Sequence, residues 1–368
     1  MRHLLSRLKI LSLSTVFPNP AEPGLGLFVR SRLQYLSAHA EIRVVAPIPL
    51  FDYSSARGER TRPANIPRRR TDGALDVWHP TWFYPPGGTP LNFVALFARL
   101  ALPLALLRKR YRFDLIDAHF GHPEGAAAAL LASTLGVPFT VTLRGNETRD
   151  AQSPGRRRAI ANAMRKAARV ITVSENLREL AISLGAPPER VKTIGNGINP
   201  ALFHARANRT GLREKYGIGV GQKAILSAGY LIERKGHHRI IEALATLATQ
   251  GRAPLLLIAG SAGREGVWED RIRRQVAASG LDHQVRFLGQ QTHEALAELM
   301  CACDLLCLAS TREGWPNVVH EANACGAPVV TTDVGGVRDM LPKEDYGFIV
   351  PPDDPAALGA AQIGRAHV

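Results

Sequence analysis

The chain has 368 residues, of which 45% are hydrophobic and 21% charged, the composition of a globular protein with room for two cores of ordinary size. No run of eighteen uninterrupted apolar residues occurs, which argues against a membrane-spanning helix. The net charge of +14 suits an anionic partner and includes arginine-rich runs at 68–70, 108–110 and 156–158. Solvated surface explains each run most simply, and no RNA-binding, zinc-finger or helix-turn-helix motif accompanies them, so we expect no nucleic acid partner.

Segment 1–17 has basic residues before an apolar stretch, as a secretory signal does. The stretch is short, contains two serines and lacks a cleavage site of small residues, so a buried first strand fits better. The four cysteines have no CxxC spacing and lie in apolar segments: Cys301, Cys303, Cys307 and Cys325. This pattern indicates buried thiols in a reducing compartment, and we expect a cytoplasmic protein.

Strand-like and helix-like runs alternate in the first half of the chain, which implies a parallel sheet with helices on both faces. In chain order, we predict strands at 8–17, 42–47, 115–119, 139–143 and 170–173, and helices at 28–38, at 124–135 and from residue 175. Residues 52–90 are rich in proline, arginine and glycine and are predicted as a long irregular insertion. The apolar segment 93–112 ends in basic residues, and we favour a helix packed on the core over one that rests on anionic lipid.

A second alternating series follows a polar stretch. We predict strands at 224–229, 255–260, 285–288, 305–309 and 329–332, with a helix at 237–247 and others between the strands. The expected α/β fold therefore has two Rossmann-like domains, at 1–204 and 223–362, with a linker at 205–222 and a tail at 363–368. In parallel sheets ligands bind beyond the carboxyl ends of the strands, so we expect the site in a cleft between the two halves.

The strongest chemical signal follows the strand at 305–309, in the sequence STREGWPNVVHEA. Pro316 suits the first turn of a helix, because it has no N–H to lose there. Glu313 then lies in the loop and Glu321 about a turn and a half into the helix. Two surface glutamates at chance spacing are the alternative, and the glycine, proline and asparagine around them argue against it.

The same segment combines two kinds of hydrogen-bonding group. The two carboxylates accept hydrogen bonds, as the hydroxyls of a sugar and of a ribose require. Backbone N–H groups near the start of the helix favour an anion such as phosphate: those of Gly314, Asn317 and Val318. This division between carboxylates and amides is the one that a nucleotide-sugar needs.

These residues resemble the E-x7-E signature of the retaining glycosyltransferases of GT-B fold known as family 4. The continuation EANACGAPVV, which begins at Glu321, and the later pair Gly335-Gly336 match that family's usual pattern. The resemblance implies that the domain at 1–204 is the acceptor side and that the domain at 223–362 binds the nucleotide-sugar. It also implies that Glu313 contacts hydroxyls of the donor sugar and that Glu321 contacts the ribose. It also implies transfer, with retention, from a nucleotide-diphosphate-sugar to a glycan or lipid-linked acceptor in the synthesis of cell-surface polysaccharide or glycolipid. The nucleotide-sugar is then a co-substrate, and neither a bound cofactor nor a divalent metal is indicated.

A second motif, GYLIERKG, lies between the strand at 224–229 and the following helix. An ammonium group beside a helix N-terminus suits a diphosphate. The resemblance implies that Lys235 binds the pyrophosphate, whereas Tyr230 stands where the family usually has an arginine. Arg234 is the candidate replacement for that cation, and an exposed side chain without a role is the competing interpretation.

A glycine-containing loop, PGLGLF, follows the first strand. It differs from a dinucleotide fingerprint, because Val29 replaces the last glycine and no acidic residue ends the second strand. Gly24 and Gly26 instead resemble the family's loop near the donor phosphates. A simple turn explains Gly24 equally well and Gly26 less well.

Two further places follow strands of the first half. His119 ends its strand, and the resemblance implies that it lies near the donor sugar. A hydrogen-bonded histidine within the core is the competing interpretation, which we favour less. A metal site formed with His122 and Glu124 does not fit a standard zinc spacing. Arg144 and Glu147 follow the strand at 139–143, where they either touch acceptor or donor or form a structural salt bridge within the loop.

We therefore assign catalysis to Glu313, His119 and Lys235. The predicted donor-binding residues are Gly26, Arg234, Lys235, Glu313, Gly314, Pro316, Asn317, Val318 and Glu321. Two alternatives remain: a sugar-nucleotide epimerase of the same fold, and a non-catalytic module that binds a polyanion or a membrane. The expected partners are a nucleotide-sugar, a glycan or lipid-linked acceptor, and peripheral contact with the inner face of an anionic membrane.

The chain ends soon after the segment 351–358, where a helix is expected to begin. The resemblance implies one or two further helices there. Residues 363–368 also resemble one frame of a common sequencing adapter. We expect a truncated gene fragment whose last residues are not native.

Overall fold

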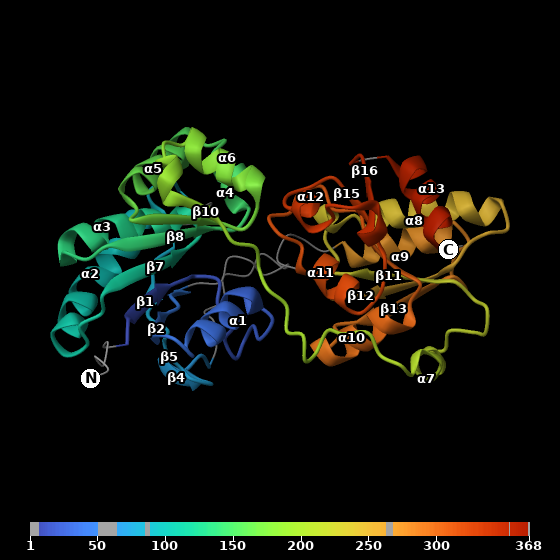
Figure 1. Cartoon of the computed structure of the whole chain (residues 1–368), viewed down its shortest axis with the longest axis horizontal. Helices are drawn as coiled ribbons and strands as arrows, with labels where there is room; N and C mark the ends of the chain where they lie inside the picture. The colour runs from blue at the N-terminus through green and yellow to red at the C-terminus, as the bar shows by residue number, and fades with distance from the viewer. Residues whose placement is uncertain (1–6, 51–64, 85–88, 263–267, 353, 367–368) are drawn as a thin grey trace, which may run out of the picture. The chain divides into compact units, whose positions relative to one another are not determined.

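The computed structural model describes residues 7–50, 65–84, 89–262, 268–352 and 354–366. The chain divides into two compact units, residues 1–196 and 197–368 (Figure 1). Each unit contains one large sheet covered by helices, and the predicted α/β fold with parallel sheets is confirmed.

The first unit is built on an eight-stranded sheet with the order β10-β9-β8-β7-β1-β2-β5-β4. All neighbouring strands are parallel except β4, which pairs antiparallel with β5. The strands are β1 (Lys9–Leu13), β2 (Glu41–Val45), β4 (Arg69–Asp72), β5 (Leu75–Trp78), β7 (Leu115–His119), β8 (Phe139–Leu143), β9 (Arg169–Thr172) and β10 (Val191–Thr193), with a separate short pair formed by β3 (Ile48–Pro49) and β6 (Thr81–Trp82).

Helices cover both faces of this sheet. The helices are α1 (Leu27–Leu36), α2 (Asn92–Arg110), the π-helix η1 (Gly121–Gly125), α3 (Ala126–Leu135), α4 (Asn146–Asp150), α5 (Pro154–Lys166), α6 (Glu175–Ser183) and the short η2 (Pro188–Arg190). One face packs against α1 through Val29 and Leu33. The opposite face packs against α2, α3 and α5, whose buried side chains share one core.

The prediction of an irregular insertion at 52–90 is wrong for the residues that the structure describes there. Strands β4 and β5 form a hairpin that extends the sheet, and β5 continues it parallel to β2. Leu75 and Val77 alternate inward, and Gly73 closes the turn with a φ of 60°. An inward alternation of two residues is too short to stand out from a segment dominated by proline and arginine. Residues 51–64 and 85–88 of this segment lie outside the described residues.

The second unit has a six-stranded parallel sheet with the order β13-β12-β11-β14-β15-β16. The strands are β11 (Ala224–Ala228), β12 (Leu255–Ala259), β13 (Val285–Gly289), β14 (Leu305–Leu308), β15 (Val329–Thr332) and β16 (Gly347–Val350). The helices are α7 (Arg209–Lys215), η3 (Glu233–Lys235), α8 (His237–Thr249), α9 (Glu269–Ala278), α10 (His293–Ala302), α11 (Asn317–Ala324), α12 (Val337–Met340), η4 (Glu344–Tyr346) and α13 (Pro355–Ala366).

Two cores lie on the two faces of this second sheet. Helices α10, α11 and α12 cover one face, and α8, α9 and α13 cover the other. The four cysteine thiols are free and buried, as predicted. None of the helices within the described ranges combines the length and the hydropathy that a membrane span requires.

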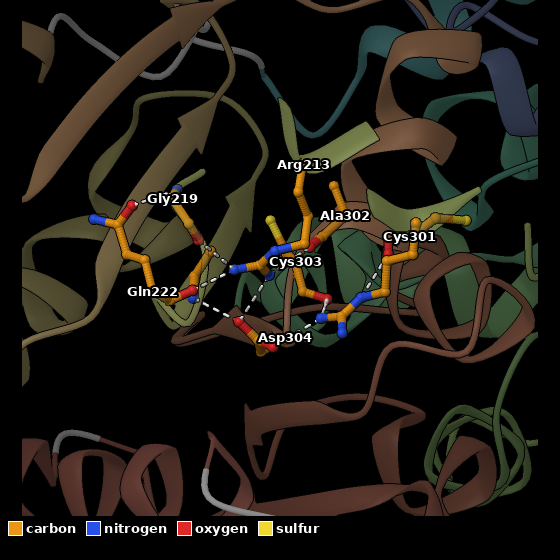
Figure 2. Close-up of polar contacts among 9 residues, drawn as sticks. Arg213, Gly219, Gln222, Cys301, Ala302, Cys303 and Asp304 are labelled. Carbon is orange, nitrogen blue, oxygen red and sulfur yellow. Dashed lines mark hydrogen bonds and ion pairs between the residues drawn. The ribbon is translucent and has the colours of Figure 1, made fainter. Parts of the chain in front are cut away.

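A cluster of arginines fixes the amino-terminal ends of β11 and β14. Asp304, just before β14, accepts from Arg209 at 2.7 Å, from Arg213 at 3.3 Å and from the backbone N–H of Ala224 at 2.7 Å. Figure 2 shows the Arg213 guanidinium between Asp304 and the backbone of Gly219, Gln222 and Ala302. These contacts hold α7, which lies within the predicted linker, against the end of α10. The two strands thereby start from a fixed position, and their opposite ends carry the candidate site.

Candidate active site

Three loops meet at the carboxyl ends of β11, β14 and β15, which are neighbours in the second sheet. The backbone N–H of Thr311 donates to the Arg234 carbonyl at 2.9 Å, which joins the first two loops. The N–H of Gly336 donates to the Gly314 carbonyl at 3.0 Å, which joins the third. The two motifs singled out from the sequence therefore form one continuous surface.

The Glu313 carboxylate lies at the centre of this surface. Its Oε1 accepts from Lys235 Nζ at 2.7 Å and from Ser310 Oγ at 2.7 Å. Its Oε2 lies 3.5 Å from Arg234 Nη1, which also donates to the Arg312 carbonyl at 3.1 Å. The side chains of Glu313 and Lys235 are 10% and 15% exposed, so the pair is largely shielded from water.

The two cations determine the ionisation state of this carboxylate. Burial alone would raise the pKa of Glu313, but Lys235 and then Arg234 outweigh it and hold the pKa below its ordinary value. Glu313 is thus an anion at neutral pH and accepts hydrogen bonds. It does not hold a proton that it could donate to a substrate.

Two glycines let the loops approach this closely. Gly236 has a φ of 72°, and a Cβ there would come within 1.9 Å of the Ala309 carbonyl oxygen. Gly335 has a φ of 58°, and a Cβ there would come within 2.4 Å of the Glu313 carbonyl oxygen. A larger residue at either position would force the loops apart.

Helix α11 starts directly after the Glu313 loop. Pro316 is its N-cap rather than its first helical residue, one position from the prediction. The first N–H groups of a helix are directed out of its N-terminus. They lie at 317 and 318, where the sequence predicts an anion contact.

Glu321 lies on α11 and differs from Glu313 in its surroundings. Burial raises the pKa of its carboxyl to about 7. Within the described part of the chain, no hydrogen bond or ion pair joins this carboxyl to Lys235 or to any other side chain. Among the described residues, Lys235, Arg234 and Glu313 therefore come together, and the Glu321 carboxyl has no polar side-chain partner.

In the first unit, His119 ends β7 as predicted, but its ring is fully buried. Nδ1 accepts from Arg144 Nη2 at 3.0 Å, so the proton of the neutral ring lies on Nε2, which faces Asp117 Oδ2 at 3.2 Å and Ser12 Oγ at 3.1 Å. Burial lowers the pKa of His119 to about 4. Burial opposes the charge on Asp117 as well, but hydrogen bonds and His119 lower its pKa to about 2. The histidine is thus neutral and Asp117 ionised at neutral pH.

Arg144 and Glu147 are both buried, but their side chains form hydrogen bonds with different partners. Arg144 binds His119 and donates from Nη1 to Asn196 Oδ1 at 3.0 Å. Glu147 accepts three backbone N–H groups, from Gly121 at 2.8 Å, Arg144 at 3.1 Å and Gly145 at 2.9 Å. Among the described residues no ion pair joins the two side chains. The loop salt bridge, one of the two alternatives for this pair, is therefore not formed, and the Glu147 carboxylate instead holds the backbone of the loop.

The remaining candidate residues of the first unit, Gly26, His122 and Glu124, have structural roles within that unit. Gly26 has a φ of 67° and starts α1, and a Cβ there would come within 2.3 Å of the Val16 carbonyl oxygen. His122 Nε2 contacts the Pro90 carbonyl at 3.2 Å, while Glu124 accepts from the N–H of Thr15 at 2.8 Å. No group of three His, Cys, Asp or Glu side chains in the described ranges is arranged to hold a metal ion.

Two side-chain contacts and one buried polar atom were not predicted from the sequence. Ser310 begins the motif STREGWPNVVHEA and donates to Glu313 three residues later, and Asp117 lies two residues before His119 on the same side of β7. Both were within reach of pattern arguments. Trp315, inside the same motif, has a buried Nε1 with no hydrogen-bond partner in the described structure. Nothing in the sequence indicates that this atom is buried.

Two protein-family models match this chain, one over each half. Residues 24–202 match the family model described as Glycosyltransferase Family 4, and residues 208–363 match the one described as Glycosyl transferases group 1. A Bacillus subtilis protein, provisionally named as the teichuronic acid biosynthesis glycosyltransferase TuaC, is 28% identical over 98% of this chain and 90% of its own. The N-acetyl-alpha-D-glucosaminyl L-malate synthase of Bacillus anthracis is 27% identical over 68% of this chain and 64% of its own.

Solved structures share the fold. HepE of Anabaena, in complex with UDP, has a TM-score of 0.73 at 22% identity and covers 97% of this chain and 89% of its own. The sucrose-phosphate synthase of Thermosynechococcus elongatus has a TM-score of 0.75 at 21% identity and covers 98% and 89%. Each of these two structural matches extends over both units of this chain.

Proposed function

The chain belongs to the GT-B glycosyltransferases, matched by family models along both units, and from this premise we propose that it transfers a sugar from a nucleoside diphosphate sugar, with retention, to a glycan or lipid-linked acceptor. The observation that carries the proposal is the buried cluster in which Lys235 and Arg234 meet Glu313. Synthesis of surface polysaccharide is the setting we favour, because the relative in Bacillus subtilis is named for teichuronic acid synthesis.

The donor fits the second unit through complementary charges. The Lys235 ammonium has three donors, and Glu313 occupies one of them at 2.7 Å, so it can also hold a phosphate oxygen. The start of α11 offers N–H groups and a positive helix end to the same diphosphate. The ionised Glu313 then accepts from hydroxyls of the sugar. Glu321, one turn further along α11, accepts from the ribose.

Catalysis in this proposal rests on electrostatics and positioning. The bond between the anomeric carbon and the diphosphate breaks, and the acceptor oxygen bonds to that carbon on the same face. The acceptor proton passes to the leaving phosphate, so no enzyme carboxyl has to supply one. Lys235 and the helix amides stabilise the negative charge that develops on the diphosphate.

The first unit is proposed as the acceptor side, with the chain from residue 197 onward as the donor side. His119 has no exposed surface, so we assign it to positioning rather than to catalysis by direct contact. It holds Arg144, whose guanidinium also reaches Asn196 at the end of the unit. Of the other proposed donor contacts, Gly26, Gly314, Asn317 and Val318 act through backbone groups, and Pro316, which has no N–H, sets the start of α11. We place the reaction on the cytoplasmic side, where nucleotide-sugars are made.

The test is turnover with defined donors, with UDP-glucose first because HepE was solved with it. Release of nucleoside diphosphate that depends on an added acceptor, with the donor's anomeric configuration kept in the product, is the expected result. A sugar-nucleotide epimerase would convert donor with no acceptor present. Conversion of donor alone, or a product of inverted configuration, would refute the proposal.

A further inference from the structure

Helix α2 is apolar on two opposite sides. Its inner side carries Leu96, Leu100 and Leu104, which are fully buried in the core of the first unit. An outer stripe runs along the other side at a spacing of four residues: Val94, Ala98, Leu102 and Leu106. Leu102 and Leu106 are 68% and 53% exposed. The outer leucines are not part of the core cluster of this unit.

The outer stripe ends in cations. Lys109 and Arg110 follow Leu106 by three and four residues, which places them on the same side of the helix one turn further on. Both are exposed, as is Arg112 just beyond the helix. In the described part of the chain no carboxylate pairs with any of these three. The stripe from Val94 to Leu106 is about 18 Å long, since a helix rises about 1.5 Å per residue.

A cavity of about 680 Å³ opens beside the basic end of α2. Arg108, Lys109 and Arg112 line it together with one carboxylate, Asp114, which accepts from the backbone N–H of Lys9 at 2.7 Å. The ends of α2 and α3 add about half a negative charge each. The three cations exceed these negative contributions, so the cavity wall is positive and suits a phosphate group.

The surrounding surface has the same sign. Helices α2, α3 and α5 lie side by side on one face of the first sheet (Figure 1), and together they contain nine Lys and Arg residues and no Asp or Glu. The bias extends to the whole unit. Residues 1–196 contain 28 Lys and Arg against 14 Asp and Glu, whereas residues 197–368 contain 18 of each. The entire net charge of +14 therefore belongs to the first unit.

We propose that the outer side of α2 docks on an anionic phospholipid bilayer, with Val94, Leu102 and Leu106 at the acyl boundary and Lys109, Arg110 and Arg112 at the lipid phosphates. An apolar stripe with a cationic end on a helix parallel to the surface is the arrangement that interfacial helices use. Charge complementarity selects the bilayer over a second copy of this chain, because two copies would bring two positively charged surfaces together. The helix lies on the membrane and does not cross it.

The test is co-sedimentation of the full chain with phosphatidylcholine vesicles that contain about one third phosphatidylglycerol, and with phosphatidylcholine alone. The expected result is saturable binding to the anionic vesicles, weakened by salt, and little binding to the neutral ones. Leu102→Gln/Leu106→Gln should lower the partition coefficient about tenfold or more. Lys109→Gln/Arg110→Gln should lower it about tenfold to thirtyfold, because each cation near the surface contributes about 1 kcal/mol. All four side chains are largely outside the core, so thermal unfolding of the variants should match the wild type.

A matched variant, Arg157→Gln/Arg158→Gln, removes the same charge from α5, where no exposed apolar stripe occurs. It should lower the partition coefficient clearly less than Lys109→Gln/Arg110→Gln does. Equal losses for the two charge variants would assign the attraction to net charge alone and overturn the role of α2. Vesicle binding by Leu102→Gln/Leu106→Gln at the wild-type level would also overturn it. So would a change in oligomeric state of that variant without a change in vesicle binding, since the stripe would then contact another copy.

Discussion

Lys235 Nζ lies 2.7 Å from Glu313 Oε1, although the two residues are 78 positions apart in the chain. They come from the loops after β11 and β14, which are neighbouring strands of one sheet. Ser310 donates a hydrogen bond to the same Glu313 oxygen, and Arg234 lies beside the other carboxylate oxygen. A buried carboxylate held by two cations at the carboxyl edge of a parallel sheet gives specific expectations for substitutions.

Glu313→Gln should reduce turnover by about a hundredfold or more, because the amide cannot offer two anionic acceptors to the sugar hydroxyls. Folding should change little, since Ser310 and the loop backbone keep their contacts. Affinity for the nucleoside diphosphate should hold or rise, because Lys235 loses its competing anion. Glu233→Gln, an exposed neighbour of the same charge, is the control and should leave turnover unchanged. Turnover of Glu313→Gln within a few fold of the wild type would rule out the assigned role.

Lys235→Ala should weaken binding of the nucleoside diphosphate about tenfold to a hundredfold, the value of a charge-assisted hydrogen bond of about 1.5–3 kcal/mol. Lys235→Arg should recover part of the loss, since charge is kept but geometry is not. Isothermal titration gives both affinities. Lys223→Ala removes an exposed lysine just before β11 and should bind as the wild type does. Unchanged affinity in Lys235→Ala would contradict the placement of the diphosphate.

Glu321 should make donor binding sensitive to pH. Burial raises its pKa to about 7, and a ribose hydroxyl needs the ionised form as its acceptor. Donor affinity of the wild type should therefore fall as the pH drops below about 7, by up to tenfold per unit from this group. Glu321→Gln should bind more weakly at pH 8 and show a flatter profile, measured by titration from pH 6 to pH 8. Parallel profiles for the two proteins would show that Glu321 does not contact the donor.

Glu124 should make stability, rather than binding, depend on pH. Burial raises its pKa to about 7 from an ordinary value of 4.5, so the folded state holds the proton that the unfolded state releases. Its contribution is fully present below pH 4.5 and is lost as the pH rises through 7. Glu124→Gln should therefore be more stable than the wild type at pH 8, by on the order of 2 kcal/mol, and not at pH 4.5. Denaturant unfolding at the two pH values measures this, and a difference that does not grow with pH would contradict it.

The strands of this protein were the most predictable part of its fold. The strands β7, β8 and β15 have the predicted bounds, because short apolar runs bounded by loop residues mark buried parallel strands. The hairpin β4–β5 was missed because its apolar alternation is short and its flanks are rich in proline and arginine. Helix α5 was missed because a run of arginines hides the buried side of a helix that starts at Pro154.

The candidate site was predictable at the level of its motifs but not of its contacts. The order of the motifs and their positions after strands indicated a shared edge of the sheet, because carboxyl ends of adjacent parallel strands lie together. That Arg234 points to Glu313 depends on side-chain direction, which the sequence leaves open. The burial of His119 depends on Asp117, Arg144 and Ser12, which come from three strands or loops and meet only in the folded unit.

A thermal-shift panel of nucleoside diphosphates and nucleotide-sugars on the wild-type chain tests the central claim most directly. We predict that at least one nucleoside diphosphate sugar raises the melting temperature in a saturable manner, and that Lys235→Ala loses most of that shift. A folded wild-type protein that no member of the panel stabilises, or a shift that Lys235→Ala fully retains, would contradict the account.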